Sequence, residues 1–161
     1  MLKQKNNLLL IIILFFILGA LISAFIIEYV LGHKPCNLCI YERIPYIFSV
    51  FLIITILFSS KYEKITLLIL GIVFIFSGIL ALYHLGIEQG FINESFVCKS
   101  KTLSGSLSKE QILEQLKQNN ISCKDVSFKI LGLSLASINT IFSIILSVIF
   151  IKLFINYGKN K

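Results

Sequence analysis

The sequence predicts an all-α fold, an integral membrane four-helix bundle with two extracytoplasmic loops and a short amphipathic helix in the second loop. Hydrophobic residues make up 57% of the 161 residues and charged residues only 14%, whereas about half of an ordinary soluble domain is apolar. The hydrophobic residues are gathered into four runs, and a run of about 18 or more such residues is typical of a membrane span. We therefore expect a single membrane domain over residues 1–161.

The first two spans are predicted at residues 8–27 and 44–60. Residues 8–27 supply about the 20 residues that cross the hydrocarbon layer as a helix. A cleaved signal peptide is an alternative, but this run exceeds the usual apolar core of about 7 to 15 residues. Pro45 is expected at the start of the second helix, where its missing N–H costs nothing.

The last two spans are predicted at residues 65–85 and 130–151. Ser134, Ser137, Asn139, Ser143 and Ser147 lie in the fourth run, and small residues of this kind suit close packing between membrane helices. The four spans leave two loops on one side of the membrane, at residues 28–43 and 86–129.

The distribution of basic residues orients the bundle. An even number of spans places both termini and the 61–64 turn on one side, with seven Lys residues against eight Lys and Arg residues on the other. Because the positive-inside rule weights short segments next to spans, we expect cytoplasmic termini and periplasmic loops in a bacterial inner membrane. We attribute the net charge of +7 to these basic residues at the membrane edges. Nucleic-acid binding is not expected, because the basic residues are not interleaved with the aromatic residues that stack on bases.

All four cysteines fall in the two loops of the same side. Cys36 and Cys39 form a C-x-x-C motif, here named the inner pair; Cys98 and Cys123 are named the outer pair. Disulfides persist in oxidising compartments such as the periplasm, and C-x-x-C spacing can close a small disulfide and lower a thiol pKa. An incomplete zinc ribbon is disfavoured because the outer cysteines are 25 residues apart, so no metal is expected. Two structural disulfides remain an alternative.

Two polar residues accompany the inner pair at the membrane edge. With a second helix starting near Glu42 or Arg43, Cys39 would lie just before its positive end, which favours a thiolate. Arg43 either snorkels to water or meets an anion or polar ligand. His84, at the end of the third span, is either an interfacial residue or, with Arg43, one of two groups that bind a quinone head group.

The loop between the outer cysteines contains a helix signal. Ser108 and Gln111 form a capping box, and Leu107 with Ile112 suit a hydrophobic staple. The amphipathic helix that follows would rest on the membrane surface or a partner, or pack over the spans.

Four stretches of this sequence resemble the bacterial disulfide bond formation protein B (DsbB) family. They are PCNLCIYER before the second span, YHLGIEQG after the third, the pair Cys98 and Cys123, and KILGLSLASIN entering the fourth span. The resemblance covers nearly the whole chain. It is weakest in the connecting loop, which is rich in Lys and Ser and has no Pro or Trp.

The resemblance implies a four-helix bundle of the inner membrane that reoxidises a periplasmic thioredoxin-like dithiol oxidase (DsbA-like) and passes the electrons to a quinone, either ubiquinone or menaquinone. It implies that Cys98 is attacked by the partner's thiolate and has Cys123 as its disulfide mate. Cys36 and Cys39 would be linked to the quinone, with Cys39 touching its ring. Arg43 and His84 match positions near the family's quinone site.

Three other function classes were weighed. A non-catalytic membrane scaffold stapled by two disulfides is the main alternative. A transporter lacks support because no Asp, Glu, Lys or Arg lies deep within a predicted span. A reductase working in the opposite direction would need a cysteine on the cytoplasmic side to receive electrons, and the sequence has none there.

Overall fold

The computed structural model describes residues 2–59, 62–93, 98, 122–124, 129–130 and 132–159. The elements are α1 (Leu2–Tyr29), α2 (Asn37–Phe58), α3 (Glu63–Glu88), the strands β1 (Lys129–Ile130) and β2 (Leu133–Ser134), and α5 (Leu135–Lys159). The predicted loop helix near residues 108–117 lies outside the described residues.

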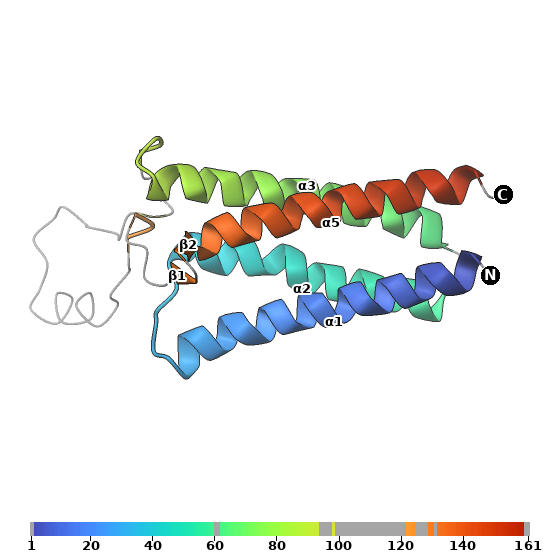
Figure 1. The fold of residues 1–161 in the computed structure, drawn as a ribbon, viewed down its shortest axis with the longest axis horizontal. Helices are drawn as coiled ribbons and strands as arrows, with labels where there is room; N and C mark the ends of the chain where they lie inside the picture. The colour runs from blue at the N-terminus through green and yellow to red at the C-terminus, as the bar shows by residue number, and fades with distance from the viewer. Residues whose placement is uncertain are drawn as a thin grey trace, which may run out of the picture.

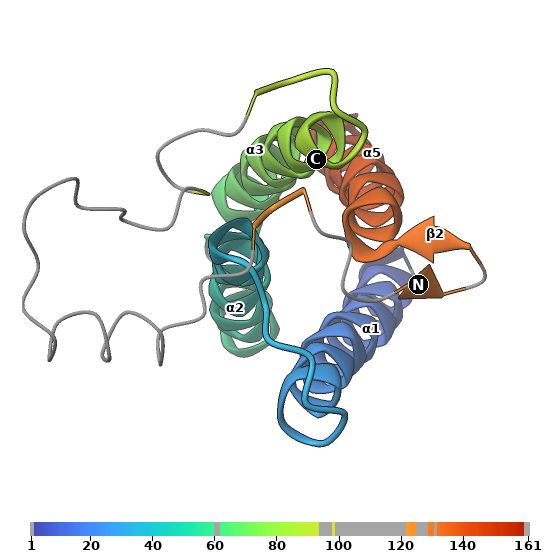
Figure 2. The ribbon, with the colours of Figure 1, turned by 90° about the vertical axis from the view of Figure 1, so that its left-hand side faces the viewer.

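Within these residues, four helices are long and apolar enough to cross a membrane, which confirms the predicted four-span bundle. They run side by side along one long axis, with both termini at the same end (Figure 1). Viewed down that axis, α2 lies between α1 and α3, and α5 closes the ring between α3 and α1 (Figure 2). The inner pair and the end of α3 lie at the end opposite the termini.

The outer surface of the bundle is as apolar as its core. Phe15, Phe51 and Phe76 are each more than 60% exposed, an arrangement that water would oppose and lipid tails would favour. The interior includes apolar side chains that are at most 1% exposed, among them Leu10, Ile17, Ile53, Leu70, Phe74 and Phe150. The chain is a multi-pass membrane protein.

Helices α3 and α5 approach each other through small residues. A Cβ at Gly71 would lie 3.1 Å from Ile151 Cγ1, and one at Gly78 would lie 3.6 Å from the Cβ of Ser143. Ser143 is buried and its hydroxyl lies 3.0 Å from that of Ser77 on α3. The prediction that hydroxyl residues of the fourth span serve close helix packing is thus confirmed for Ser143.

The predicted start of the second span was wrong. Helix α2 begins at Asn37 instead of near Glu42 or Arg43, because Cys36 adopts an extended conformation and its side chain accepts a hydrogen bond from the Cys39 N–H, as an N-cap does. Pro45 therefore lies inside α2. A membrane helix tolerates an internal proline when the surrounding structure supplies the lost contacts.

The other boundaries also shifted. Helix α3 continues to Glu88 instead of residue 85 and ends where Gly90 takes a φ of +78°, a conformation that favours glycine at helix ends. The fourth helix begins at Leu135 instead of residue 130, because the two strands β1 and β2 pair in antiparallel fashion before it, with Gly132 between them at a φ of +85°. This hairpin is a small addition to an otherwise all-α fold.

Candidate redox site

The inner pair lies at the first turn of α2. Cys36 is the N-cap residue and Cys39 follows in the first turn, so the two sulfurs are 2.8 Å apart. Cys36 Sγ also accepts from the Cys39 N–H at 3.3 Å. The position before a positive helix end, which the sequence assigned to Cys39, belongs to Cys36, because the helix begins six residues earlier than Arg43.

Cys36 lies in surroundings that favour a thiolate. Its pKa is lowered from 9.0 to about 4, first because the Cys39 thiol hydrogen-bonds to its sulfur, and then because His84 adds a hydrogen bond and charge; burial opposes both effects. His84 Nε2 is 3.5 Å from Cys36 Sγ. At neutral pH the reduced form of Cys36 is therefore a thiolate.

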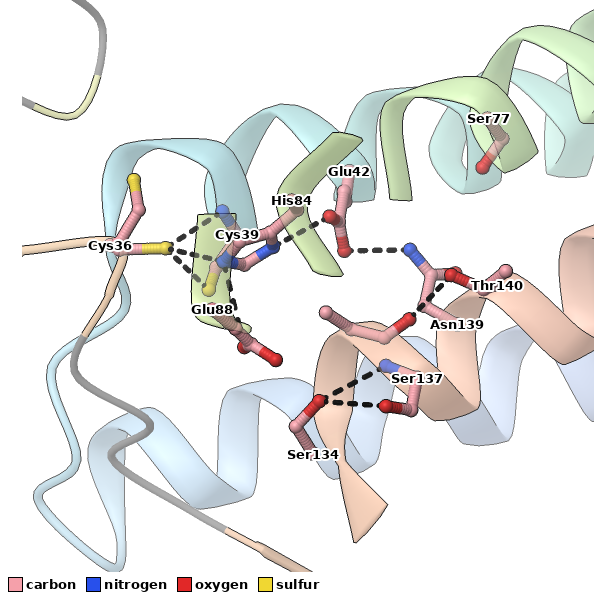
Figure 3. A network of polar contacts seen from close by, with 12 residues as sticks. Cys36, Cys39, Glu42, Ser77, His84, Glu88, Ser134, Ser137, Asn139 and Thr140 are labelled. Carbon is pink, nitrogen blue, oxygen red and sulfur yellow. Dashed lines mark hydrogen bonds and ion pairs between the residues drawn. The ribbon is translucent and has the colours of Figure 1, made fainter. Parts of the chain in front are cut away.

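His84 is held by two carboxylates. Its Nδ1 lies 2.8 Å from Oε1 of Glu42, and its Nε2 lies 3.7 Å from Oε1 of Glu88. The His84 side chain is 3% exposed, so it is no interfacial residue but part of the buried site. Figure 3 shows Cys36, His84 and Glu42 in one line of contacts.

The contacts continue from Glu42 across the bundle to α5. Asn139 Nδ2 donates to Oε2 of Glu42 at 2.7 Å, and the Tyr46 hydroxyl donates to Asn139 Oδ1 at 2.5 Å. Ser143 and Ser77 extend the network toward the middle of the bundle, with hydroxyl oxygens 3.0 Å apart. A polar chain therefore joins α2, α3 and α5 inside the membrane domain (Figure 3).

Arg43 takes a separate partner. Its guanidinium forms an ion pair with Glu28 of α1 and lies 5.2 Å from the centre of the Phe25 ring. The residue is thus neither unpaired nor simply snorkelling, since an acid and an aromatic face hold it at the membrane edge.

A cavity of about 620 Å³ opens beside the inner pair, between α1, α2 and the start of α5. Cys39, Arg43 and His84 all line it, together with Glu42, Tyr46 and Asn139. Phe15, Phe16, Leu21, Ile27, Ala136 and Phe142 supply much of its apolar wall. The structure thus brings together the three residues that the sequence associated with a quinone head group.

The outer pair forms a disulfide, Cys98–Cys123. Both cysteines are buried, with Cys98 3% and Cys123 1% exposed. They belong to one hydrophobic cluster with Cys36, Leu38 and Ile87. Cys36 is thus a buried member of the cluster that contains the outer pair, while Cys39 is partly buried at the edge of that cluster and lines the cavity. The two sulfurs of the inner pair face different neighbours.

Cys36, Cys39 and His84 offer three possible metal-ligand atoms within 4.8 Å of one another. The two sulfurs, however, are 2.8 Å apart, whereas two thiolates on one zinc ion lie roughly 3.8 Å apart, given Zn–S bonds of about 2.3 Å. The spacing favours sulfurs that exchange a disulfide over sulfurs that share a metal. That no metal is bound stays a prediction.

Three residues of the site were missed from the sequence. Glu42 was named only as a possible start of the second helix, although its position three residues after Cys39 places both on one helix face. Asn139 was grouped with the packing serines, although an amide in an apolar span suggests a polar partner. Glu88 lay beyond the predicted end of the third span.

The chain was compared with known proteins. Residues 6–153 match the family model of disulfide bond formation protein DsbB. A protein of Rickettsia prowazekii (strain Madrid E), described as the uncharacterized protein RP370, is 35% identical over 144 residues, which cover 88% of this chain and 83% of the relative. No solved structure matches the chain.

DsbB family proteins are thiol oxidoreductases with a role in disulfide bond formation. The family match spans the four helices, the inner pair, the outer pair and the residues around the cavity. This chain belongs to the disulfide bond formation protein DsbB family.

Proposed function

We propose that this protein is a quinone-reducing thiol oxidase that reoxidises a periplasmic thioredoxin-like dithiol oxidase (DsbA-like) and so supports protein disulfide bond formation. One observation carries the proposal: Cys36 belongs to the buried cluster that contains the outer disulfide, whereas Cys39 lies at the edge of that cluster and lines the cavity. The inner pair thus connects a disulfide on one side with an apolar ligand site on the other.

The first step is thiol exchange with the partner. A partner thiolate attacks Cys98, the Cys98–Cys123 bond breaks, and Cys123 leaves as a thiolate. Because both outer cysteines are buried, the partner must displace the surrounding chain before it reaches Cys98. The partner's second thiolate then closes the partner disulfide and releases Cys98.

The second step moves the electrons inward. The Cys123 thiolate attacks Cys36, the Cys36–Cys39 bond breaks, and Cys39 leaves as a thiolate that faces the cavity. Cys98 then closes the outer disulfide again and leaves Cys36 reduced. The lowered pKa of Cys36 stabilises the reduced inner pair and therefore favours electron transfer in this direction, since stabilising a dithiol makes its disulfide more oxidising.

The third step uses a quinone as the electron-accepting substrate. The cavity suits such a molecule, because it combines apolar walls from α1 and α5 with Cys39, Arg43 and His84. Arg43 has several N–H donors besides the one that Glu28 accepts, so it can also bind a carbonyl oxygen. The inner dithiol gives up two electrons and two protons, the Cys36–Cys39 disulfide returns, and the products are the quinol and the oxidised partner.

The direction of the protein in the membrane follows from the same chemistry. Partner oxidation places the cysteine end of the bundle in the periplasm and the termini in the cytoplasm. The short basic segments next to the spans support this orientation.

The proposal is tested by quinone reduction in detergent, with a reduced thioredoxin-like dithiol protein as donor. The parent is compared with Cys39→Ser, Cys98→Ser and Arg43→Met. Thr55→Ala is the matched control, since in the described part of the chain the Thr55 hydroxyl donates to the Phe51 carbonyl of its own helix. We expect turnover in the parent and the control, none in either cysteine variant, and a raised KM for quinone in Arg43→Met. Loss of one strong hydrogen bond from a charged group corresponds to roughly a tenfold to hundredfold loss of binding affinity, here for the quinone.

Absence of turnover with ubiquinone and menaquinone analogues, combined with four permanently oxidised cysteines, would contradict the proposal. That result would instead support a membrane scaffold stapled by two disulfides.

A further inference from the structure

Asn139 is an amide within a candidate membrane span, where an unpaired polar group would be costly. Each end of its side chain has a partner on α2. Nδ2 donates to Glu42 Oε2 at 2.7 Å, and Oδ1 accepts from the Tyr46 hydroxyl at 2.5 Å. Glu42 and Tyr46 are one helical turn apart, so two contacts fix the orientation of the amide.

The Glu42 carboxylate also contacts a second helix, α3. Its other oxygen, Oε1, lies 2.8 Å from Nδ1 of His84 on α3, and Nε2 of His84 lies 3.5 Å from Cys36 Sγ. Glu42 is only 7% exposed, and Arg43, its neighbour in sequence, is paired with Glu28. The described contacts of the Glu42 carboxylate are thus His84 and Asn139.

We propose that Asn139 is a positioning residue of the redox site: by holding Oε2 of Glu42, it keeps Oε1 on His84 Nδ1 and so keeps His84 Nε2 beside the Cys36 sulfur. Cys36, His84 and Glu42 then form a thiol, imidazole and carboxylate in series, with the amide fixing the last member. Such a series is the usual arrangement for orienting an imidazole toward a thiol.

The step that this arrangement assists is a proton transfer. The Sγ–H bond of Cys36 breaks, a bond between that proton and His84 Nε2 forms, the negative charge stays on sulfur, and the imidazolium lies against the Glu42 carboxylate. The role of this proton transfer in turnover rests on the proposed function. The ionisation of Cys36 itself can be measured without a quinone or a partner.

Several charged groups surround Cys36 and must stay constant in the test. Cys39 faces it from α2, and His84 and Glu88 face it from α3. The Glu28–Arg43 pair joins α1 to α2, and His33 and Lys34 lie on the cavity wall. None of these is altered by a substitution at position 139.

The experiment titrates the ultraviolet thiolate absorbance of the full-length protein, reduced in detergent, with Cys98 and Cys123 replaced by Ser. The transition that disappears in Cys36→Ser belongs to Cys36. The variants are Asn139→Leu, the isosteric Asn139→Asp and, as matched control, Thr140→Val, because among the described residues the Thr140 hydroxyl donates to the Ala136 carbonyl of its own helix and not to the redox site. Thermal unfolding is recorded for each variant.

We expect the Cys36 transition to move upward by about one pH unit or more in both Asn139 variants, a tenfold change in the thiol–thiolate equilibrium, and to stay in place in Thr140→Val. Asn139→Asp keeps the acceptor for Tyr46 but replaces the donor that faces Glu42 by a second acid, so it breaks the contact with Glu42 by loss of the donor and by repulsion. Asn139→Leu breaks the same contact without adding a charge. If Asn139→Leu does not fold, Asn139→Asp carries the test.

A double-mutant cycle separates positioning from packing. In a Glu42→Gln background, Asn139→Leu, which adds no charge, should cause no further shift of the Cys36 transition, because the two residues act through one chain of contacts. A transition that stays unmoved in both Asn139 variants, or shifts that add fully in the Glu42→Gln background, would overturn the proposal. Absence of quinone turnover with a shifted transition would contradict the proposed function and leave this inference standing.

Discussion

At the scale of single residues, the inner pair is asymmetric because its two sulfurs have different surroundings. Cys36 caps a helix, contacts His84 and packs with the outer disulfide, while Cys39 lines the cavity. The attacked sulfur of such a pair should lie on the side of the incoming thiolate, and the leaving sulfur on the side of the next acceptor. The proposed relay follows this order.

The ionisation of Cys36 gives a pH prediction. Its thiolate should persist as the pH falls from neutral and disappear only near its pKa of about 4, because lowering the pH through the pKa protonates the sulfur. His84→Gln should move the transition to higher pH, since the variant removes the positive charge beside the sulfur. The measurement is the thiolate absorbance of the reduced protein lacking the outer pair. An ordinary thiol transition near 9.0 in the parent would contradict this account.

Residue-level prediction from sequence succeeded where spacing or loop position was informative. The C-x-x-C motif, the outer cysteines, Arg43 and His84 could all be selected in this way. Glu42 and Asn139 were missed because their roles depend on a contact between residues 97 positions apart, which no local pattern encodes.

At the scale of helices, the packing of α3 on α5 depends on glycine. Gly78→Leu should lower the unfolding midpoint in detergent, because the new side chain would enter the space beside Ser143, and overpacking costs about 1 to 3 kcal/mol. Gly19→Leu is the control, since a Cβ there meets no atom within 4 Å. Equal midpoints for the two variants would show that the close approach of α3 and α5 does not stabilise the bundle.

Helix existence was predictable and helix boundaries were not. The four apolar runs were long enough to identify every span, because the length of a membrane helix is set by the bilayer. The start of α2 was misplaced because Pro45 resembles a helix start, while the true N-cap is a cysteine, which is an uncommon capping residue. The hairpin before α5 depends on Gly132 and has too few residues to give a strand pattern.

At the scale of the whole molecule, all the redox groups lie at one end of the bundle and both termini lie at the other (Figure 1). The proposed function requires the cysteine end to face the periplasm. With the four native cysteines replaced by Ser, Phe91→Cys should react with a membrane-impermeant maleimide in intact cells, because Phe91 is 84% exposed at this end. Tyr62→Cys, between α2 and α3, should react only after lysis. The reverse labelling pattern would exclude periplasmic partner oxidation.

The central claim is that the outer and inner pairs form one relay in which Cys36 receives the outer thiolate. The most direct measurement is mild oxidation of the Cys39→Ser, Cys98→Ser double variant, in which Cys36 and Cys123 remain, followed by disulfide mapping of its peptides. The control is the Cys36→Ser, Cys98→Ser variant, which pairs Cys39 with Cys123. We predict a Cys36–Cys123 disulfide that forms faster than any disulfide in the control. Free thiols at Cys36 and Cys123 under these conditions, or faster crosslinking of Cys39, would contradict the relay.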